Sequence, residues 1–156
     1  MKRSESSRKM SRNSVYWIYK DNRSVNRNAY NDMKIGYDNC IVGTNATSGP
    51  QIHIGSLILN MDSNHNWICI YENCGSASNE EAKIWSQSPG GLIWNFNYKV
   101  KPLTPLVRYT KEMQQIIRKN HPENTSHFFN QVRHGKKGSS HDRTINLLKD
   151  FINQNL

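Results

Sequence analysis

Two apolar runs separated by a short polar turn constrain the fold of this chain more than any other feature. The first run is 52–59, the second is 67–71, and the turn at 62–66 reads Asp-Ser-Asn-His-Asn. Runs rich in β-branched and aromatic residues that stop at Asp, Ser and Asn are typical of strands joined by a four- or five-residue connection. The sequence therefore predicts an antiparallel β-hairpin at the centre of the fold.

Further strands and helices follow from hydrophobic periodicity and from turn residues. An aromatic and β-branched run at 14–19 predicts a first strand, and residues 92–100, which alternate apolar and polar from Trp94 to Val100, predict a half-buried strand that Pro102 and Pro105 end. Helical spacing predicts a short helix over 24–33 that ends before Gly36, and helices over 110–119, 126–133 and 141–154. Residues 43–50, 73–83 and 86–91 are expected to form loops and turns.

These elements predict one small α+β domain over 14–156, with about five to six strands in a curled sheet or barrel and helices packed outside it. A length of 156 residues fits a single core. Residues 1–13 lack apolar periodicity and are expected to form a disordered basic arm. We also expect a monomer.

The net charge of +9 is concentrated at two places in the chain. Residues 1–12 carry five Lys or Arg and one Glu, and residues 111–143 carry seven basic and three acidic residues, whereas the body is almost neutral. This distribution predicts an anionic partner, and nucleic acid rather than a membrane, because no amphipathic segment joins these charges to a broad apolar face. Without a long apolar run or an apolar N-terminal core, the chain is expected to be intracellular, in the nucleus or the cytoplasm.

Metal and catalytic chemistry find little support in the sequence. Three cysteines and six histidines are present, but Cys69 lies inside a predicted strand, five positions before Cys74, and no second pair has zinc-like spacing. Cys69 is therefore predicted to be a small buried residue. Neither a nucleophile elbow nor a phosphate-binding glycine loop occurs, so the sequence predicts a protein that is not an enzyme and that has no metal or cofactor.

Tryptophan and tyrosine are abundant for so polar a chain. Trp17, Trp67 and Trp94 fall inside predicted strands, which favours packing in the core. Trp85 instead begins a loop of small residues, so it is the candidate wall of a binding pocket.

Several segments together resemble the YTH domain. Residues 14–22 are similar to its opening strand, residues 51–71 to its central hairpin, and Ile84-Trp85-Ser86-Gln87 with residues 90–98 and 103–105 to its Trp-Ser-Gln segment, glycine-containing loop and alternating strand. The resemblance spans about residues 14–108, with a fainter likeness over 128–137. The related EVE and PUA-like domains share this architecture.

The resemblance implies a domain that binds single-stranded RNA carrying N6-methyladenine in an aromatic cage. Trp85 matches a cage tryptophan, and Asn22 matches a polar residue that contacts the base edge, with Asp21 and Lys20 as alternatives. No Trp follows the first helix, so Tyr37 is the nearest aromatic wall, with Asn39 or Cys40 as non-aromatic alternatives. The third wall is expected at Pro89 or Leu92.

Basic residues in the last third are the candidate phosphate contacts, because phosphate contacts position a nucleic acid while base contacts specify it. They are Arg118, Lys119, Arg133, His134, Lys136 and Lys137. Two alternatives stay open: recognition of another modified base in RNA or DNA by an EVE-like domain, and a protein-interaction domain that has lost the cage. Hydrolysis of nucleic acid is the least favoured reading.

Overall fold

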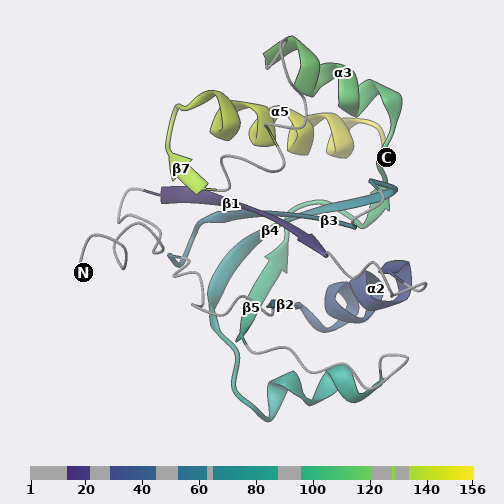
Figure 1. Cartoon of the computed structure of the whole chain (residues 1–156), viewed down its shortest axis with the longest axis vertical. Helices are drawn as coiled ribbons and strands as arrows, with labels where there is room; N and C mark the ends of the chain where they lie inside the picture. The colour runs from purple at the N-terminus through teal and green to yellow at the C-terminus, as the bar shows by residue number, and fades with distance from the viewer. Residues whose placement is uncertain are drawn as a thin grey trace.

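The computed structural model of this chain describes residues 14–21, 29–44, 53–62, 65–87, 96–120, 128 and 134–156. A curled β-sheet forms its middle, and helices pack on both faces of that sheet (Figure 1). The strands are β1 (Ser14–Asp21), β2 (Ile41–Thr44), β3 (Leu57–Asp62), β4 (Trp67–Ser76), β5 (Phe96–Pro102), β6 (Val107–Arg108) and β7 (His134–Lys136). The helices are α2 (Ala29–Asn39), the 3-10 helix η1 (Glu81–Gln87), α3 (Lys111–Asn120) and α5 (Ser140–Gln154). The predicted α+β fold is confirmed, with seven strands among the described residues where five or six were expected.

The order of strands across the sheet is β2-β5-β4-β3-β1-β7, and β6 pairs with β4 outside this path. Strand β1 is parallel to β3, with Ile18 opposite Leu59, and antiparallel to β7, with Trp17 opposite His134. All other pairings are antiparallel. The predicted first strand is thus an interior strand of the described sheet.

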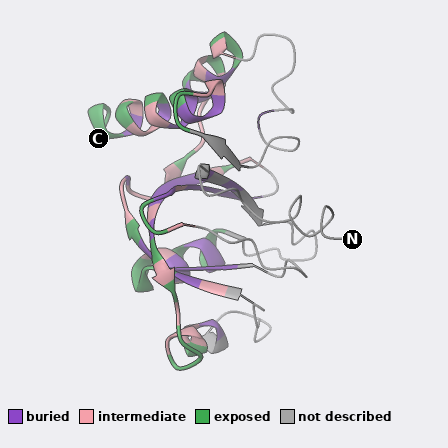
Figure 2. Cartoon of the chain, turned by 90° about the vertical axis from the view of Figure 1, so that its left-hand side faces the viewer, coloured by how far each residue is buried: buried purple, intermediate pink, exposed green. Residues whose placement is uncertain are grey.

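Alternate residues of the central strands feed two separate hydrophobic cores, as the two-residue repeat of a strand requires. Leu59 and Met61 of β3 belong to the core under α3 and α5, whereas Ile58 belongs to the core that Tyr37 of α2 covers. Buried residues follow the strands and the inward sides of the helices (Figure 2). The two faces of the sheet therefore carry different helices and different side chains.

The predicted hairpin is present as β3 and β4, with Leu59 opposite Ile70. Its turn is held by the buried Asp62 carboxylate, which accepts the backbone N–H groups of Asn66 and Trp67, both at 2.7 Å. The first strand of this hairpin, β3, begins at Leu57 and not at residue 52, because residues 54–55 form a turn. Gly55 has a φ of +91° there, which interrupts an extended chain.

The first helix was predicted to end before Gly36, and that prediction is wrong. Helix α2 continues through Gly36 to Asn39, and it stops at Cys40, whose φ of +57° is left-handed. A Cβ at Gly36 would lie 2.5 Å from the Ile41 carbonyl oxygen and 3.1 Å from Cη2 of Trp85. The glycine is therefore needed for close approach of two neighbours and does not terminate the helix. The predicted helical residues 24–28 lie outside the described residues.

Two of the predicted loops begin as strand. Residues Gly43 and Thr44 belong to β2 and not to a loop, since β2 pairs with β5 from Ile41 to Thr44. The polar residues 73–76 continue β4, because Asn73 is buried and its amide donates to the His53 carbonyl at 3.0 Å. The described part of the strand predicted at 92–100 is β5, and Leu92 and Trp94 lie outside the described residues.

The helices predicted at 110–119 and 141–154 are confirmed as α3 and α5. Helix α5 begins at an N-cap, where the Ser139 hydroxyl accepts the backbone N–H of Asp142 at 3.2 Å. Strands β6 and β7 were not predicted. The helix expected over 126–133 lies outside the described residues, apart from the buried Phe128.

Within the part of the chain that the structure describes, no helix has both the length and the apolar composition needed to cross a membrane.

Candidate base-binding site

Trp85 lies in η1, not at the start of a loop. A reciprocal pair of hydrogen bonds begins this helix: the Ser78 N–H donates to the Glu81 carboxylate at 3.0 Å, and the Glu81 N–H donates to the Ser78 hydroxyl at 3.1 Å. These hydrogen bonds hold the pKa of Glu81 below its usual range. The pattern Ser-x-x-Glu at 78–81 is visible in the sequence, and it is the signal that could have predicted η1.

The Trp85 side chain is only 5% exposed and is held in one orientation. Its indole N–H donates to the Asn97 amide oxygen of β5 at 2.7 Å. Cη2 at one edge of the ring comes close to Gly36 of α2, as described above. With Ile41 it forms a small apolar cluster against which Ile35, Ala77, Ala82 and Ile84 pack. The ring is thus enclosed by its neighbours and presents almost no open face in the free protein.

Tyr37 is one residue from the glycine that Trp85 approaches, yet its ring belongs to another cluster. Tyr37 packs against Tyr71 of β4, with ring centroids 6.5 Å apart and planes at 53°. Partial burial raises the pKa of the Tyr37 phenol. Trp85 therefore lies against the C-terminal half of α2, to which Tyr37 belongs, but the two rings do not share a hydrophobic cluster.

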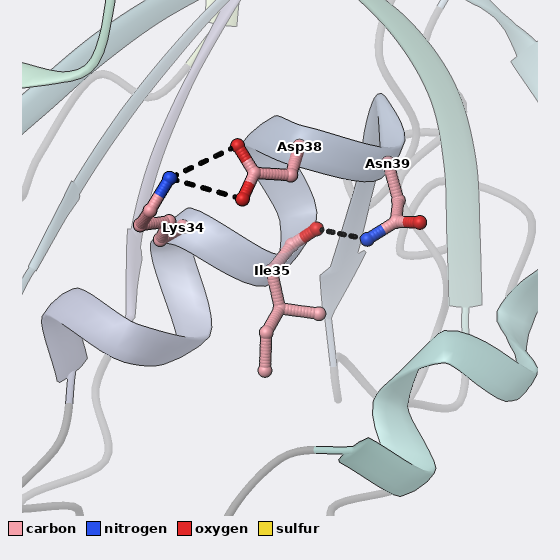
Figure 3. Close-up of polar contacts among 4 residues, drawn as sticks. All are labelled: Lys34, Ile35, Asp38 and Asn39. Atoms are coloured by element: carbon pink, nitrogen blue, oxygen red, sulfur yellow. Dashed lines mark hydrogen bonds and ion pairs between the residues drawn. The ribbon is translucent and has the colours of Figure 1, made fainter.

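The alternatives to Tyr37 lie at the exposed end of the same helix. Cys40 is exposed, and its carbonyl accepts the Val100 N–H at 2.9 Å, which connects the end of α2 to β5. The Asn39 amide donates to the Ile35 carbonyl at 2.8 Å, and Lys34 forms an exposed salt bridge with Asp38 at 3.0 Å (Figure 3). These polar side chains serve α2 itself in the free protein.

The predicted base-edge residues fall at the end of β1. Asp21 is the last residue of this strand and has Asp62 as its partner in β3, while Lys20 pairs with Met61. Asn22, Pro89 and Leu92 lie outside the described residues. On the β3 side, the neighbouring Asn60 is 6% exposed, and its amide oxygen has no hydrogen-bond partner in the described part of the chain. Sequence reasoning gave no role to this buried acceptor.

The predicted phosphate contacts are divided between two elements. Arg118 and Lys119 are exposed in the last turn of α3, whereas His134 and Lys136 belong to β7 and the exposed Lys137 follows it. Helix α5 packs against both α3 and β7. Arg133 lies outside the described residues. Because α3 covers the face of the sheet opposite to α2, Arg118 and Lys119 are separated from Trp85 by the sheet (Figure 1).

Trp67 was predicted to pack in the core, and that prediction is wrong. It is half-buried at the start of β4, where the Tyr30 ring of α2 lies 4.3 Å from it between centroids, at an angle of 45°. The Arg108 guanidinium of β6 lies 4.9 Å from the centroid of the indole. A tryptophan that directly follows a turn sits at a strand end, where neighbouring strands give less cover, and this position was visible in the sequence. The structure does not describe the side chains of Trp17 and Trp94.

Cys69 is fully buried as predicted, and its thiol donates to the Thr104 carbonyl at 3.4 Å. Burial raises the pKa of this thiol to about 12. Within the described ranges, no group of three or more His, Cys, Asp or Glu residues is placed to hold a metal ion.

A comparison of the chain with protein-family models gives no match, and a comparison with curated proteins gives none either.

Proposed function

We propose that this protein binds single-stranded RNA without catalysis and recognises N6-methyladenine at Trp85. The observation that carries the proposal is the restraint on the Trp85 ring, which a hydrogen bond to Asn97 and a close approach to Gly36 fix in one orientation. An indole ring held in this way keeps its orientation when the residues around it move aside, and a base stacked on it then contributes about 1–3 kcal/mol.

The burial of Trp85 determines how a base would enter. Because the residue is 5% exposed, a base that stacks on it has to displace part of the surrounding cluster, which includes Ile35 and Ile84. That displacement costs free energy and lowers the apparent affinity. A methyl group on the base offsets part of this cost by burying additional apolar area, at about 0.8 kcal/mol per carbon. Recognition of the methyl group is then a consequence of a tight apolar cluster.

The proposal rests on Trp85 rather than on two facing aromatic walls, since Tyr37 contacts Tyr71 in another cluster. Discrimination between methylated and unmodified adenine is therefore expected to be modest. The positive charge supports a nucleic-acid partner, because Arg108, Arg118 and Lys119 form no salt bridge within the described part of the chain.

Fluorescence anisotropy tests the proposal with two short single-stranded RNAs that differ in one N6-methyl group, at constant physiological salt. We expect the methylated RNA to bind about fourfold more tightly, which is about 0.8 kcal/mol. Trp85→Ala should remove this difference, and Trp85→Phe, which keeps a smaller ring, should retain part of it. Circular dichroism of both variants establishes that they are folded. Equal binding of the two RNAs by the unmodified chain would exclude the methyl-reading function.

A second candidate, binding of a protein partner, is favoured by a groove on the other face of the sheet. It has a volume of about 490 Å³ and lies between α3, α5 and β6, with Met113, Phe151, Ile152 and Leu156 among its lining residues. An apolar side chain of a partner would fit such a groove. Absence of RNA binding at all salt concentrations would favour this protein-binding function.

A third possibility is an EVE-like preference for another modified base. The fluorescence-anisotropy titration, carried out with DNA that contains modified bases, tests it.

A further inference from the structure

A stack of one aromatic pair and one arginine lies at the junction of α2, β4 and β6. Trp67 and Arg108 are directly opposite each other in the antiparallel pairing of β4 and β6, so their side chains are on the same face of the sheet. The guanidinium lies 4.9 Å from the indole centroid, and Tyr30 contacts the indole at 4.3 Å between ring centroids.

This stack is held by backbone hydrogen bonds on both sides. The Trp67 N–H donates to the buried Asp62 carboxylate at 2.7 Å, which fixes the start of β4. The Tyr109 N–H donates to the Asn66 carbonyl at 2.8 Å, which holds β6 against the hairpin turn. The backbone positions of Trp67 and Arg108 are therefore set by the sheet and by the hairpin turn.

The stack is accessible and positively charged. Arg108 is exposed, Tyr30 is 36% exposed, and Arg108 forms no salt bridge with any carboxylate in the described ranges.

We propose that Tyr30, Trp67 and Arg108 form a second nucleotide site, in which a base of single-stranded RNA stacks on the Arg108 guanidinium. Guanidinium planes and aromatic rings are the surfaces on which proteins stack unpaired bases. An acidic peptide would bind the N–H edge of the Arg108 guanidinium through its carboxylates, whereas the rings of Trp67 and Tyr30 beside it add stacking surfaces, which favour a base. This inference rests on the proposed RNA binding, but it does not depend on recognition of the methyl group.

The test separates charge from stacking with two variants of one residue. Arg108→Ala is expected to lower the affinity for both the methylated and the unmodified RNA by about tenfold. Arg108→Lys keeps the charge but loses the plane, and should still bind about fivefold more weakly than the unmodified protein. Lys101→Ala, which removes an exposed cation of β5 away from the stack, is the matched control and should change the affinity less than twofold.

Photocrosslinking supplies a second readout that does not depend on affinity. RNA containing 5-iodouridine, irradiated with the full chain, should attach to the peptide that contains Tyr30 or Trp67, and Arg108→Ala should reduce the yield. Wild-type affinity in Arg108→Lys would show that charge alone is used and would overturn the stacking site, as would crosslinks confined to other peptides.

The two proposals fail in different ways. If the affinity falls in Arg108→Ala while the chain binds both RNAs equally, the stacking site stands and methyl reading at Trp85 fails. If the methylated RNA is preferred and Arg108→Ala leaves both affinities unchanged, methyl reading at Trp85 stands and the stacking site fails.

Discussion

Asn97 holds Trp85 through its side chain: the indole N–H donates to the Asn97 amide oxygen at 2.7 Å. The backbone carbonyl of the same Asn97 accepts the N–H of Ala77 at 2.9 Å. Asn97 of β5 is therefore hydrogen-bonded both to Ala77, which precedes η1, and to Trp85 within η1. The orientation of the candidate base-stacking ring depends on this single strand position.

Replacing Asn97 with Ala should lower the free energy of unfolding by about 1–3 kcal/mol, because the nearly buried indole N–H loses its acceptor. Urea denaturation followed by tryptophan fluorescence measures this change. Preference for the methylated RNA should fall in the same variant. Asn153→Ala, which removes an exposed bond to the Leu103 carbonyl, is the control and should cost less than about 0.5 kcal/mol. Equal effects of the two variants would contradict a special role for Asn97.

Gly36→Ala should destabilise the protein, although alanine normally favours a helix by about 0.5–1 kcal/mol over glycine. The new Cβ would lie 2.5 Å from the Ile41 carbonyl oxygen, and that atom belongs to the backbone and cannot turn away. We expect a loss of about 1–3 kcal/mol in thermal or urea unfolding. Asp38→Ala on the same helix, which breaks the exposed salt bridge with Lys34, should cost less than about 0.5 kcal/mol. A more stable Gly36→Ala variant would show that Gly36 and the Ile41 carbonyl of β2 are farther apart than described.

The three cysteines should differ in reactivity. Cys40 and Cys74 are exposed, whereas Cys69 is buried with a pKa raised to about 12. At pH 8 a thiol-specific reagent should modify two thiols per folded chain, and the third only after unfolding. Peptide mapping identifies the sites. Rapid modification of Cys69 in the folded protein would contradict the packing of β4 against Thr104.

Stability should decrease in alkaline solution. The Cys69 thiol has a usual pKa of 9.0 and a folded value of about 12, so above pH 9 the unfolded chain releases a proton that the folded chain keeps. Unfolding is then favoured as the pH rises, by about 1.4 kcal/mol per unit for one such group, up to the folded pKa. Burial also raises the pKa of Tyr109, from 10.0 to about 12, which adds to the effect above pH 10.

Urea denaturation between pH 8 and pH 10 measures this dependence. Cys69→Ala should flatten the decrease between pH 9 and pH 10, whereas Cys74→Ala, at an exposed position, should leave it unchanged. A slope that is the same in both variants would assign the alkaline loss to other groups.

The fold could be predicted where a segment carries its own signal. The hairpin β3–β4 and the amphipathic helices α3 and α5 have clear hydrophobic periods, and all of them were predicted. Strands β2, β6 and β7 have two to four residues each, too few to show a period, and they are strands because they pair with β5, β4 and β1. Their existence depends on neighbours that are distant in the sequence.

The burial of side chains in the candidate sites also depends on neighbours that are distant in the sequence. Sequence alone placed Trp85 at a pocket edge and Trp67 in the core, yet Trp85 is 5% exposed and Trp67 is half-buried beside Arg108. Both tryptophans lie at the end of an element, so their burial depends on what packs there from elsewhere. Gly36 for Trp85 and β6 for Trp67 are tertiary partners, and no local pattern in the sequence identifies them.

Strand β1 leaves the ribosome before the two strands that pair with it on either side. Tyr16 pairs with Leu57 of β3 and with Gly135 of β7, so the sheet is complete only after residue 135 has been synthesised. Until then, one side of β1 has unpaired backbone N–H and C=O groups. The nascent chain therefore carries an open strand edge until residue 135 is available, and chaperone binding or pairing with another copy competes with folding over that period.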